Sequence, residues 1–231
     1  MEGRYNKSYF DMDIMDEEVA LSREGYQRIV KHIILDLPPK SKILDVGCGR
    51  GAYLKNIHDL RPDLILYGVD IGDVEEYLPD FIVFHKKSAE KLPFKNDEFD
   101  LLICFHVLEH VYNPEKCLFE FNRVLKEEGL LYIESPYYKT TTVPDGNMNF
   151  WSDPTHIRPY NHSSFHRLLE ETGFEILKIK VWRSWITVLL GPYLILKRIF
   201  LNDQDALSTF CAHMVGHSIG ALGKKLLSDK K

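Results

Sequence analysis

The feature that most constrains the fold is the segment ILDVGCGRGAYL, residues 43–54. An apolar run ends there at Asp45 and is followed by three glycines at alternate positions, Gly47, Gly49 and Gly51. Glycines permit left-handed backbone angles and let a ligand approach the main chain without a Cβ in between. A buried strand, a glycine turn and a helix in this order are typical of α/β sheets that bind ligands at the carboxyl ends of their strands.

The following residues alternate between apolar runs and helical stretches. Strands separated by helices indicate right-handed βαβ units, in which parallel strands are buried and read as continuous apolar runs. The pattern predicts a Rossmann-like, doubly wound and mostly parallel sheet with helices on both faces. Strands are expected at 42–46, 64–69, 81–84, 99–104 and 129–134, with helices after Gly51 and around 114–126.

Three regions are expected along the chain. Residues 1–37 form an N-terminal helical cap, because apolar positions from Val19 to Ile34 recur at helical spacing until Pro38. Residues 38–182 form the sheet domain, which contains a long aperiodic loop at 136–162. Residues 183–231 are expected to be a helical addition that ends in a fraying basic tail.

The loop at 136–162 should be followed by a helix and a strand. The helix, SSFHRLLEETGF, is expected to begin at a serine cap, Ser163 or Ser164, and to end at Gly173. The segment EILKIKVW follows it and predicts a further strand.

Composition limits the class of partner and the compartment. The net charge of -5 argues against a general attraction to nucleic acid. The four cysteines share no C-x-x-C spacing, and the N-terminus lacks the basic start and apolar run of a secretory signal. We therefore expect reduced thiols in a cytoplasmic protein.

Two acids flank the glycine loop and bear on its ligand. The spacing of Gly47, Gly49 and Ala52 also satisfies the dinucleotide pattern G-x-G-x-x-G/A, so an NAD-binding oxidoreductase stays an alternative. Asp45, however, precedes the glycines, where a carboxylate suits a cationic amino group and repels a pyrophosphate. Asp70 ends the next strand, where two carboxylate oxygens can accept both hydroxyls of a ribose.

Four motifs in register carry a family resemblance. The motifs LDVGCGRG, YGVD, SAEKLPFKNDEFDLLICFHVLEHV and FNRVLKEEGLLYIESP follow one another over roughly residues 40–136. In this order they resemble the class I S-adenosylmethionine-dependent methyltransferases, particularly the type 11 methyltransferase-domain branch that acts on small molecules. The resemblance implies a seven-stranded-type sheet, S-adenosyl-L-methionine as cofactor, and methyl transfer to a small-molecule acceptor.

The resemblance also implies a set of cofactor-binding residues. Asp45 would line the methionine end, Asp70 would hold the ribose, and Ile71 would lie against the adenine. Ser88 departs from the family, in which this position is commonly Asp, so the adenine contact could come from Ser88 or from Glu90. The implied cofactor-binding set is Asp45, Gly47, Cys48, Gly49, Gly51, Asp70, Ile71, Ser88, Ala89, Glu90, Phe105 and His106.

The segment FHVLEHV offers candidate catalytic side chains in Glu109 and His110. It also reads as H-x-x-E-H, a zinc-peptidase arrangement in which two histidines share a helix face. That motif belongs in a long helix, whereas this segment follows a buried run and reaches Pro114, which suits a strand leading into a loop. We therefore expect no metal here, and a structural turn is as good an interpretation as a catalytic one.

His156 is the first choice for a general base. Pro154 and Pro159 restrict the backbone on either side of it, which would help to aim the imidazole at an acceptor. A hydroxyl acceptor would gain about 10²–10⁴-fold from a base, and histidine titrates near neutral pH. A histidine that only binds the loop backbone is the competing interpretation. Arg158 and nearby tyrosines are candidates for the acceptor pocket.

Residues 184–196 carry no charge and fall short of the roughly 20 residues that a membrane span needs. Residues 185–201 could cover an apolar acceptor or rest on a membrane or lipid surface, and a core helix or dimer contact is the alternative. The oligomeric state is left as monomer or homodimer. The acceptor is left as a glycan, another polar metabolite, or a lipid or quinone-like ring. A binding module that holds the cofactor without transferring methyl is the remaining alternative.

Overall fold

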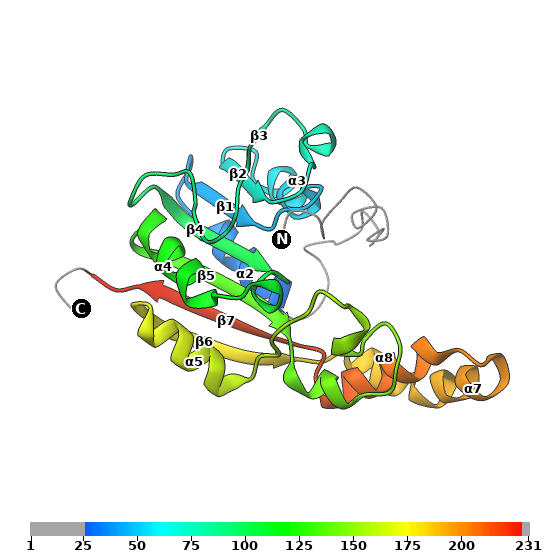
Figure 1. The fold of residues 1–231 in the computed structure, drawn as a ribbon. Coiled ribbons are helices and arrows are strands. Elements are labelled where there is room, and N and C mark those ends of the chain that lie inside the picture. The colour runs from blue at the N-terminus through cyan, green and yellow to red at the C-terminus, as the bar shows by residue number, and fades with distance from the viewer. Residues whose placement is uncertain (1–25, 228–231) are drawn as a thin grey trace.

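The computed structural model describes residues 26–227, and these form one twisted sheet with helices on both faces (Figure 1). The strands are β1 (Lys42–Val46), β2 (Ile65–Asp70), β3 (Ile82–Lys86), β4 (Phe99–Phe105), β5 (Leu125–Pro136), β6 (Phe174–Trp182) and β7 (Ser218–Lys225). Their order is β3-β2-β1-β4-β5-β7-β6, and β7 pairs antiparallel with both neighbours. The prediction of a mostly parallel, doubly wound sheet is confirmed.

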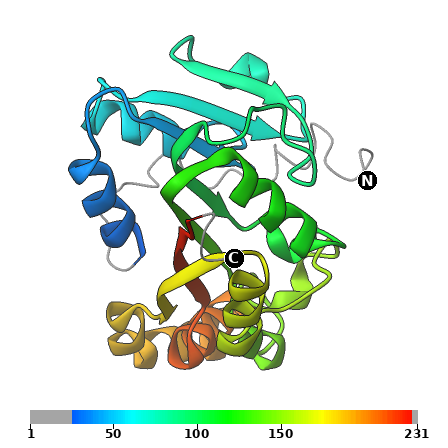
Figure 2. The ribbon, with the colours of Figure 1, turned by 90° about the vertical axis from the view of Figure 1, so that its left-hand side faces the viewer.

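Helices α2 (Tyr26–Asp36) and α3 (Ala52–Leu60) cover one face of the sheet, and α4 (Pro114–Val124) and α5 (His162–Glu171) cover the other (Figure 2). Alternate residues of each strand point to opposite faces. Thus Ile43 packs with α2 and α3, whereas its neighbour Leu44 packs with α4 and α5. Residues 1–25 of the expected N-terminal cap lie outside the described residues.

The expected helical addition at 183–231 is wrong for residues 218–225, and the expected fraying of its basic tail, GKKLLSDKK (223–231), is wrong for residues 223–225. Residues 218–225 form β7, which lies between β5 and β6 and pairs with β5 from Leu130 to Pro136. The segment SIGALGKK has few of the large β-branched residues that mark a strand, so its sequence is a weak signal. Close contact explains one of its small residues, since a Cβ on Gly220 would lie 2.2 Å from the Tyr132 hydroxyl.

The cap of α5 also differs from the expectation. Asn161 is the N-cap, and its side chain accepts a hydrogen bond from the Ser164 amide. The Ser164 hydroxyl in turn accepts a hydrogen bond from the Asn161 amide, which completes a capping box. The helix therefore begins at His162, because Asn161 competes successfully for the cap with the serines that follow it.

Between β6 and β7 the chain forms three helices, α6 (Trp185–Leu189), α7 (Gly191–Leu201) and α8 (Gln204–Val215), which project from the sheet as an arm (Figure 1). The 3-10 turns η1 (Glu75–Tyr77), η2 (Leu108–His110), η3 (Tyr138–Thr142) and η4 (Phe150–Ser152) lie in the connections. Among residues 26–227, no helix has the length and apolar character that would let it cross a membrane.

Candidate functional site

The glycine loop joins β1 to α3 at the carboxyl edge of the sheet. Gly47, Gly49 and Gly51 have φ of 80°, 48° and 73°, left-handed values that other residues adopt at a cost. A Cβ on Gly47 would lie 2.1 Å from Val107, whereas a Cβ on Gly49 would meet no atom of residues 26–227 within 4 Å. The main chain at Gly49 is therefore open to a ligand, while Gly47 is needed for packing.

Asp45 ends β1 directly before this loop, and only 3% of it is exposed. Burial, together with the nearby charge of Asp70, raises the pKa of Asp45 to about 8. A buried carboxyl group in this state gains from a cationic partner, because a positive charge nearby favours its ionised form. The position and the chemistry of Asp45 fit the ammonium group of an amino-acid ligand.

Asp70 ends β2 and holds the backbone of the glycine loop. Its Oδ2 accepts a hydrogen bond from the Gly49 amide at 2.9 Å, and its Oδ1 accepts one from the Gly72 amide at 2.8 Å. Burial raises the pKa of Asp70, and these amide hydrogen bonds oppose that shift. The Ile71 amide also acts on this carboxylate, so one of its roughly four acceptor directions remains for a hydrogen bond from a ligand.

The remaining predicted cofactor residues follow the ends of β2, β3 and β4. Ser88 is exposed, and its hydroxyl accepts a hydrogen bond from the Glu90 amide at 3.2 Å. Glu90 also pairs with Lys116 of α4 at 3.4 Å, so its carboxylate already has a cationic partner. Ala89 is buried and Ile71 is half-buried.

Cys48 and Phe105 belong to the packing beneath the glycine loop. Burial raises the pKa of the Cys48 thiol, and the charges of two nearby acids add to this, so the thiol is neutral. Phe105 packs on Tyr53 of α3, with 4.7 Å between the ring centroids. Cys48, like the other three cysteines, forms no disulfide among the described residues.

His106 follows β4 with a φ of 54° and is half exposed. This conformation turns its ring back between two buried acids. Its Nδ1 lies 3.2 Å from Glu109 Oε1, and its Nε2 lies 3.8 Å from Glu134 Oε1. Burial raises the pKa of Glu134 to about 7, although His106 and the hydrogen bond from the Tyr132 hydroxyl oppose the shift.

Glu109 lies in η2 and has no exposed surface. Burial alone would raise the pKa of Glu109, but the hydrogen bond from His106 and the nearby histidine charges outweigh burial and lower it. Its other oxygen, Oε2, accepts a hydrogen bond from Ser135 Oγ at 2.8 Å. Glu109 is therefore a buried carboxylate that its neighbours keep ionised.

His110, the next residue, forms a relay with the loop. Its Nδ1 lies 2.8 Å from Thr155 Oγ1, and Thr155 Oγ1 lies 2.6 Å from Asp153 Oδ1. Asp153 is a carboxylate and accepts the only hydroxyl proton of Thr155, so the Nδ1–H of His110 must be the donor to Thr155. His110 Nε2 is therefore the unprotonated nitrogen. Burial lowers the pKa of His110, which favours this neutral form.

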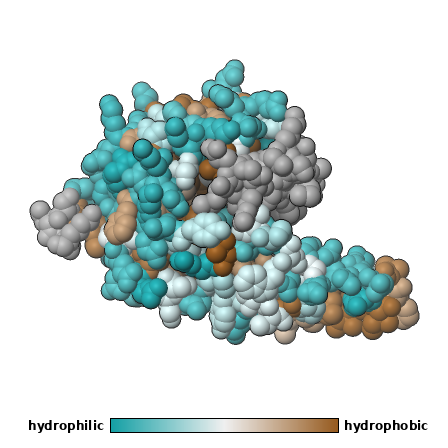
Figure 3. Space-filling model, viewed as in Figure 1, coloured by the Kyte–Doolittle hydropathy of each residue, from teal (hydrophilic) through white to brown (hydrophobic). Residues whose placement is uncertain are grey.

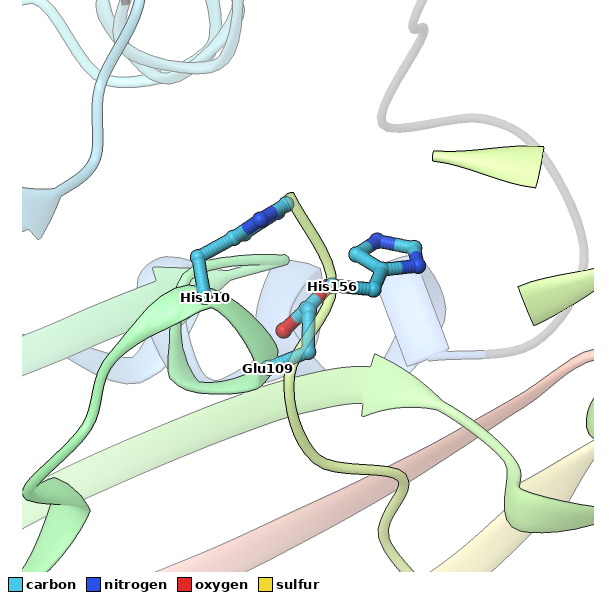
Figure 4. A group of neighbouring side chains, drawn as sticks. All are labelled: Glu109, His110 and His156. Carbon is cyan, nitrogen blue, oxygen red and sulfur yellow. The ribbon is translucent and has the colours of Figure 1, made fainter. Parts of the chain in front are cut away.

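His156 lies beside His110, with 4.7 Å between the ring centroids (Figure 4). Its Nδ1 lies 2.6 Å from the Phe150 carbonyl oxygen, and the ring stacks on Phe150. A carbonyl only accepts, so Nδ1 carries a proton, and Nε2, the unprotonated nitrogen of the neutral ring, lies 3.8 Å from Asp153 Oδ2. The histidine does bind the loop backbone, as the competing interpretation expected, but this hydrogen bond also fixes the ring.

Backbone hydrogen bonds attach the loop to η2. The amides of Ile157 and Arg158 both donate to the Glu109 carbonyl, at 2.8 and 3.2 Å, and the Tyr160 hydroxyl donates to the Leu108 carbonyl at 3.1 Å. The guanidinium of Arg158 points to Glu115 at 3.9 Å. Two segments far apart in sequence therefore meet at one place.

The structure brings the three predicted catalytic residues together but changes their context. Glu109, His110 and His156 each offer a ligand or base atom within 4.8 Å of the others. His106 and His110 do not share a helix face, since η2 is a single turn that follows β4. This agrees with the prediction that the segment is a strand leading into a loop and not a zinc-peptidase helix. Sequence reasoning missed Glu134 and the Asp153–Thr155 relay. An acid in the apolar strand LLYIESP was the available signal for Glu134.

Comparison with known proteins gives consistent matches. Residues 16–179 match the family described as "Methyltransferase domain". The chain is 24% identical to a methyltransferase of Bacillus subtilis, YcgJ, over 85% of each protein. It is 28% identical to a probable S-adenosylmethionine-dependent methyltransferase of Mycolicibacterium smegmatis, over 58% of this chain and 52% of that one.

Solved structures agree on the fold. One is the geranyl diphosphate C-methyltransferase of Streptomyces coelicolor in complex with Mg²⁺, geranyl diphosphate and S-adenosyl-L-homocysteine. It superposes with a TM-score of 0.62 at 14% identity, over 87% of this chain and 79% of that one. At this identity the match supports the fold alone.

Proposed function

Because the chain belongs to the methyltransferase-domain family and is an S-adenosylmethionine-dependent methyltransferase, we propose that it methylates a hydroxyl group of a small molecule. The observation that carries the proposal is the cluster of Glu109, His110 and His156 beside the carboxyl edge of the sheet. Two imidazoles with unprotonated Nε2 atoms and one carboxylate suit an acceptor that must lose a proton.

Family membership decides between the interpretations of the glycine loop in favour of S-adenosylmethionine over NAD. This cofactor supplies an electrophilic methyl group on a sulfonium. We propose that Asp45 binds its ammonium group, that the main chain at Gly49 lies against it, and that Asp70 receives a ribose hydroxyl. The open space above Gly49 and the raised pKa of Asp45 support these roles.

The acceptor is proposed to enter between His106 and the loop at 153–160. Positioning of the reacting groups can supply about 7–11 kcal/mol of barrier lowering, so alignment matters more than a covalent catalyst. The hydrogen bonds that hold His110 and His156 in one tautomer serve this alignment. The net charge of -5 favours a small molecule over a nucleic acid as the acceptor.

We also propose that the arm rests on an anionic membrane surface. Trp185, Leu189 and Phe200 are 65%, 79% and 76% exposed, and the outer end of the arm is hydrophobic (Figure 3). Residues 183–201 contain two arginines and one lysine and no acid. Apolar and aromatic side chains with cationic neighbours are typical of helices that lie in a membrane interface.

Contacts between the arm and the loop connect this surface to the site. The Asn147 amide donates to Asp205 of α8 at 2.8 Å, and the Met148 amide donates to Ser208 Oγ at 3.2 Å. A second copy of the chain is a weaker candidate, since a two-fold contact through α7 would bring Lys197 and Arg198 close to their own copies. The arm therefore favours an acceptor with a lipid part.

The test is transfer of labelled methyl from S-adenosylmethionine into fractionated cell extract. Label in the lipid or small-molecule fraction supports the proposal, and label in RNA or protein overturns the choice of acceptor. Binding of S-adenosylmethionine without transfer into any fraction, with acceptors of all these classes present, would favour the non-catalytic binding module.

A further inference from the structure

Glu109, His110 and His156 are arranged as metal ligands as well as acid–base groups. The three residues come from η2 and from the loop that follows η4, and one ligand atom of each lies within 4.8 Å of the other two (Figure 4). We propose that this cluster is a binding site for a divalent transition-metal ion, which holds the acceptor hydroxyl. The inference rests on the methyltransferase function proposed above.

The hydrogen bonds behind the two histidines are the main argument. A histidine that ligates a metal almost always donates its other ring N–H to a carbonyl or carboxylate group, which fixes the ring and its tautomer. His156 donates Nδ1–H to the Phe150 carbonyl, and His110 donates Nδ1–H to Thr155, which passes the interaction on to Asp153. Both rings are thus prepared to ligate through Nε2.

The carboxylate is supported in the same way. Glu109 Oε1 accepts from His106 Nδ1 and Oε2 accepts from Ser135 Oγ, at 3.2 and 2.8 Å. A carboxylate has about four acceptor directions, so each oxygen keeps one for a cation. Because Glu109 has no exposed surface, a cation beside it would be screened only weakly by water.

The donor set selects the kind of ion. Two imidazoles and one carboxylate suit Zn²⁺, Mn²⁺, Fe²⁺ or Co²⁺, whereas Mg²⁺ and Ca²⁺ prefer oxygen ligands. Three protein ligands leave at least one coordination position for another molecule, as in catalytic metal sites. In this site the open position would take the acceptor oxygen.

The ion would assist the loss of the acceptor proton. A metal ion lowers the pKa of an oxygen acid bound to it, as it does for bound water. The acceptor O–H bond breaks, its electron pair stays on the oxygen that the ion holds, and the proton leaves to solvent water. The oxygen is then ready to attack a methyl carbon.

Cobalt is the probe for the test, because its visible absorption reports the ligand set. Co²⁺ is titrated into the full chain without S-adenosylmethionine, and S-adenosylmethionine affinity is measured separately by calorimetry. We expect one Co²⁺ ion per chain and a visible absorption band. The apparent affinity for Co²⁺ should fall by more than 100-fold in His156→Ala. Thr155→Val, which keeps the shape but removes the relay hydroxyl, should lower Co²⁺ affinity by about 10–100-fold.

Two control variants separate loss of the metal site from other effects of substitution. Thr155→Ser restores the hydroxyl and should restore Co²⁺ affinity. His166→Ala removes a half-exposed histidine of α5 and should leave Co²⁺ binding unchanged. Circular dichroism of each variant separates loss of the site from loss of the fold.

The outcomes distinguish the two proposals. If Co²⁺ binds without a visible band, or if His166→Ala weakens it as much as His156→Ala does, the metal site is wrong. If the metal-free chain transfers methyl at the full rate in the presence of a chelator, the metal site is wrong and the proposed function stands. A specific Co²⁺ site in a chain that methylates no hydroxyl would leave the metal site standing and overturn the proposed function.

Discussion

Two parts of the sheet edge treat their charged groups in opposite ways. The part proposed to bind the cofactor (the cofactor half), at the ends of β1 and β2, contains Asp45 and Asp70, whose pKa values are raised by burial. The part proposed to bind the acceptor (the acceptor half), formed by η2 and the loop at 153–160, contains the buried Glu109, whose pKa is lowered by its neighbours. One half is suited to a positive charge that comes from outside, and the other is organised by the protein's own hydrogen bonds.

Because the two halves hold their buried acids differently, they should respond differently to mutation and to pH. The cofactor half should depend on a single charge and on pH. The acceptor half should depend on geometry, since Thr155, Asp153 and Phe150 hold the histidines in one orientation. Substitutions can therefore alter the affinity for S-adenosylmethionine and the rate of methyl transfer separately.

The largest effect is expected from His110→Asn. Loss of the Nε2 atom removes the group that takes up or orients the acceptor proton, so methyl transfer should fall by about 10²–10⁴-fold. The affinity for S-adenosylmethionine should change less than about twofold, because His110 lies in the acceptor half. Single-turnover transfer and calorimetry measure the two quantities. A parallel loss of cofactor affinity would show that the halves are not independent.

Asp45→Asn should have the next largest effect, and on the other quantity. The variant keeps the shape but removes the charge opposite the ligand ammonium, which costs about 2–5 kcal/mol, roughly 30-fold to several thousandfold in affinity. Calorimetric titration with S-adenosylmethionine measures the loss. Asp59→Asn is the control, since it removes an 82% exposed carboxylate near the carboxyl end of α3. Unchanged binding by Asp45→Asn would mean that the ligand ammonium lies elsewhere.

The pH dependence of cofactor binding follows from the same residue. Asp45 has a pKa of about 8 in the free protein and must lose its proton to pair with a cation. Affinity should therefore rise about tenfold for each pH unit below 8, and fall again above it as the α-amino group of the ligand, whose ordinary pKa is about 7.7–8.0, loses its proton. Calorimetric titrations at pH values about half a unit apart, between pH 6 and pH 9, measure this slope. In Asp45→Asn the rise on the acid side should disappear, and a rise that persists would assign the titration to another group.

The smallest effect is expected at the arm. Phe200→Ser removes a 76% exposed aromatic ring from α7, and partial burial in a membrane interface is worth about 1 kcal/mol, roughly fivefold in vesicle binding. Co-sedimentation with vesicles of phosphatidylcholine and phosphatidylglycerol measures it. Phe119→Ser, at a 56% exposed position on α4, is the matched control and should bind as the parent does. Equal loss in both variants would contradict an interface confined to the arm.

The cofactor half could be predicted from sequence because it is local. A strand, three glycines and a helix lie within residues 42–60, and the second acid ends the next strand. The backbone angles that the glycines permit are a property of those residues themselves. The units β1–α3–β2 and β4–α4–β5 follow from the alternation of apolar runs and helical stretches in the same way.

The contacts of the loop at 153–160 and strand β7 could not be predicted, because they depend on residues that are far apart in the sequence. The role of Thr155 requires that the loop lie on η2, and that contact joins residues 45 positions apart. Strand β7 is a weak signal in the sequence because it contains small residues such as Gly220, which the close approach of Tyr132 from β5 requires. His156 was singled out from the sequence, but its hydrogen-bond partner, the Phe150 carbonyl, was not foreseen.

The position of β7 has a consequence for how the protein is made. Since β7 separates β5 from β6, these two strands cannot join one sheet until every residue up to Lys225 has left the ribosome. Until then the β5 edge offers unpaired amides and carbonyls to any passing chain, which is a known route to aggregation. Folding of this half is thus postponed until β7 has been synthesised, and a nascent chain stalled within the arm would depend on chaperones to cover that edge.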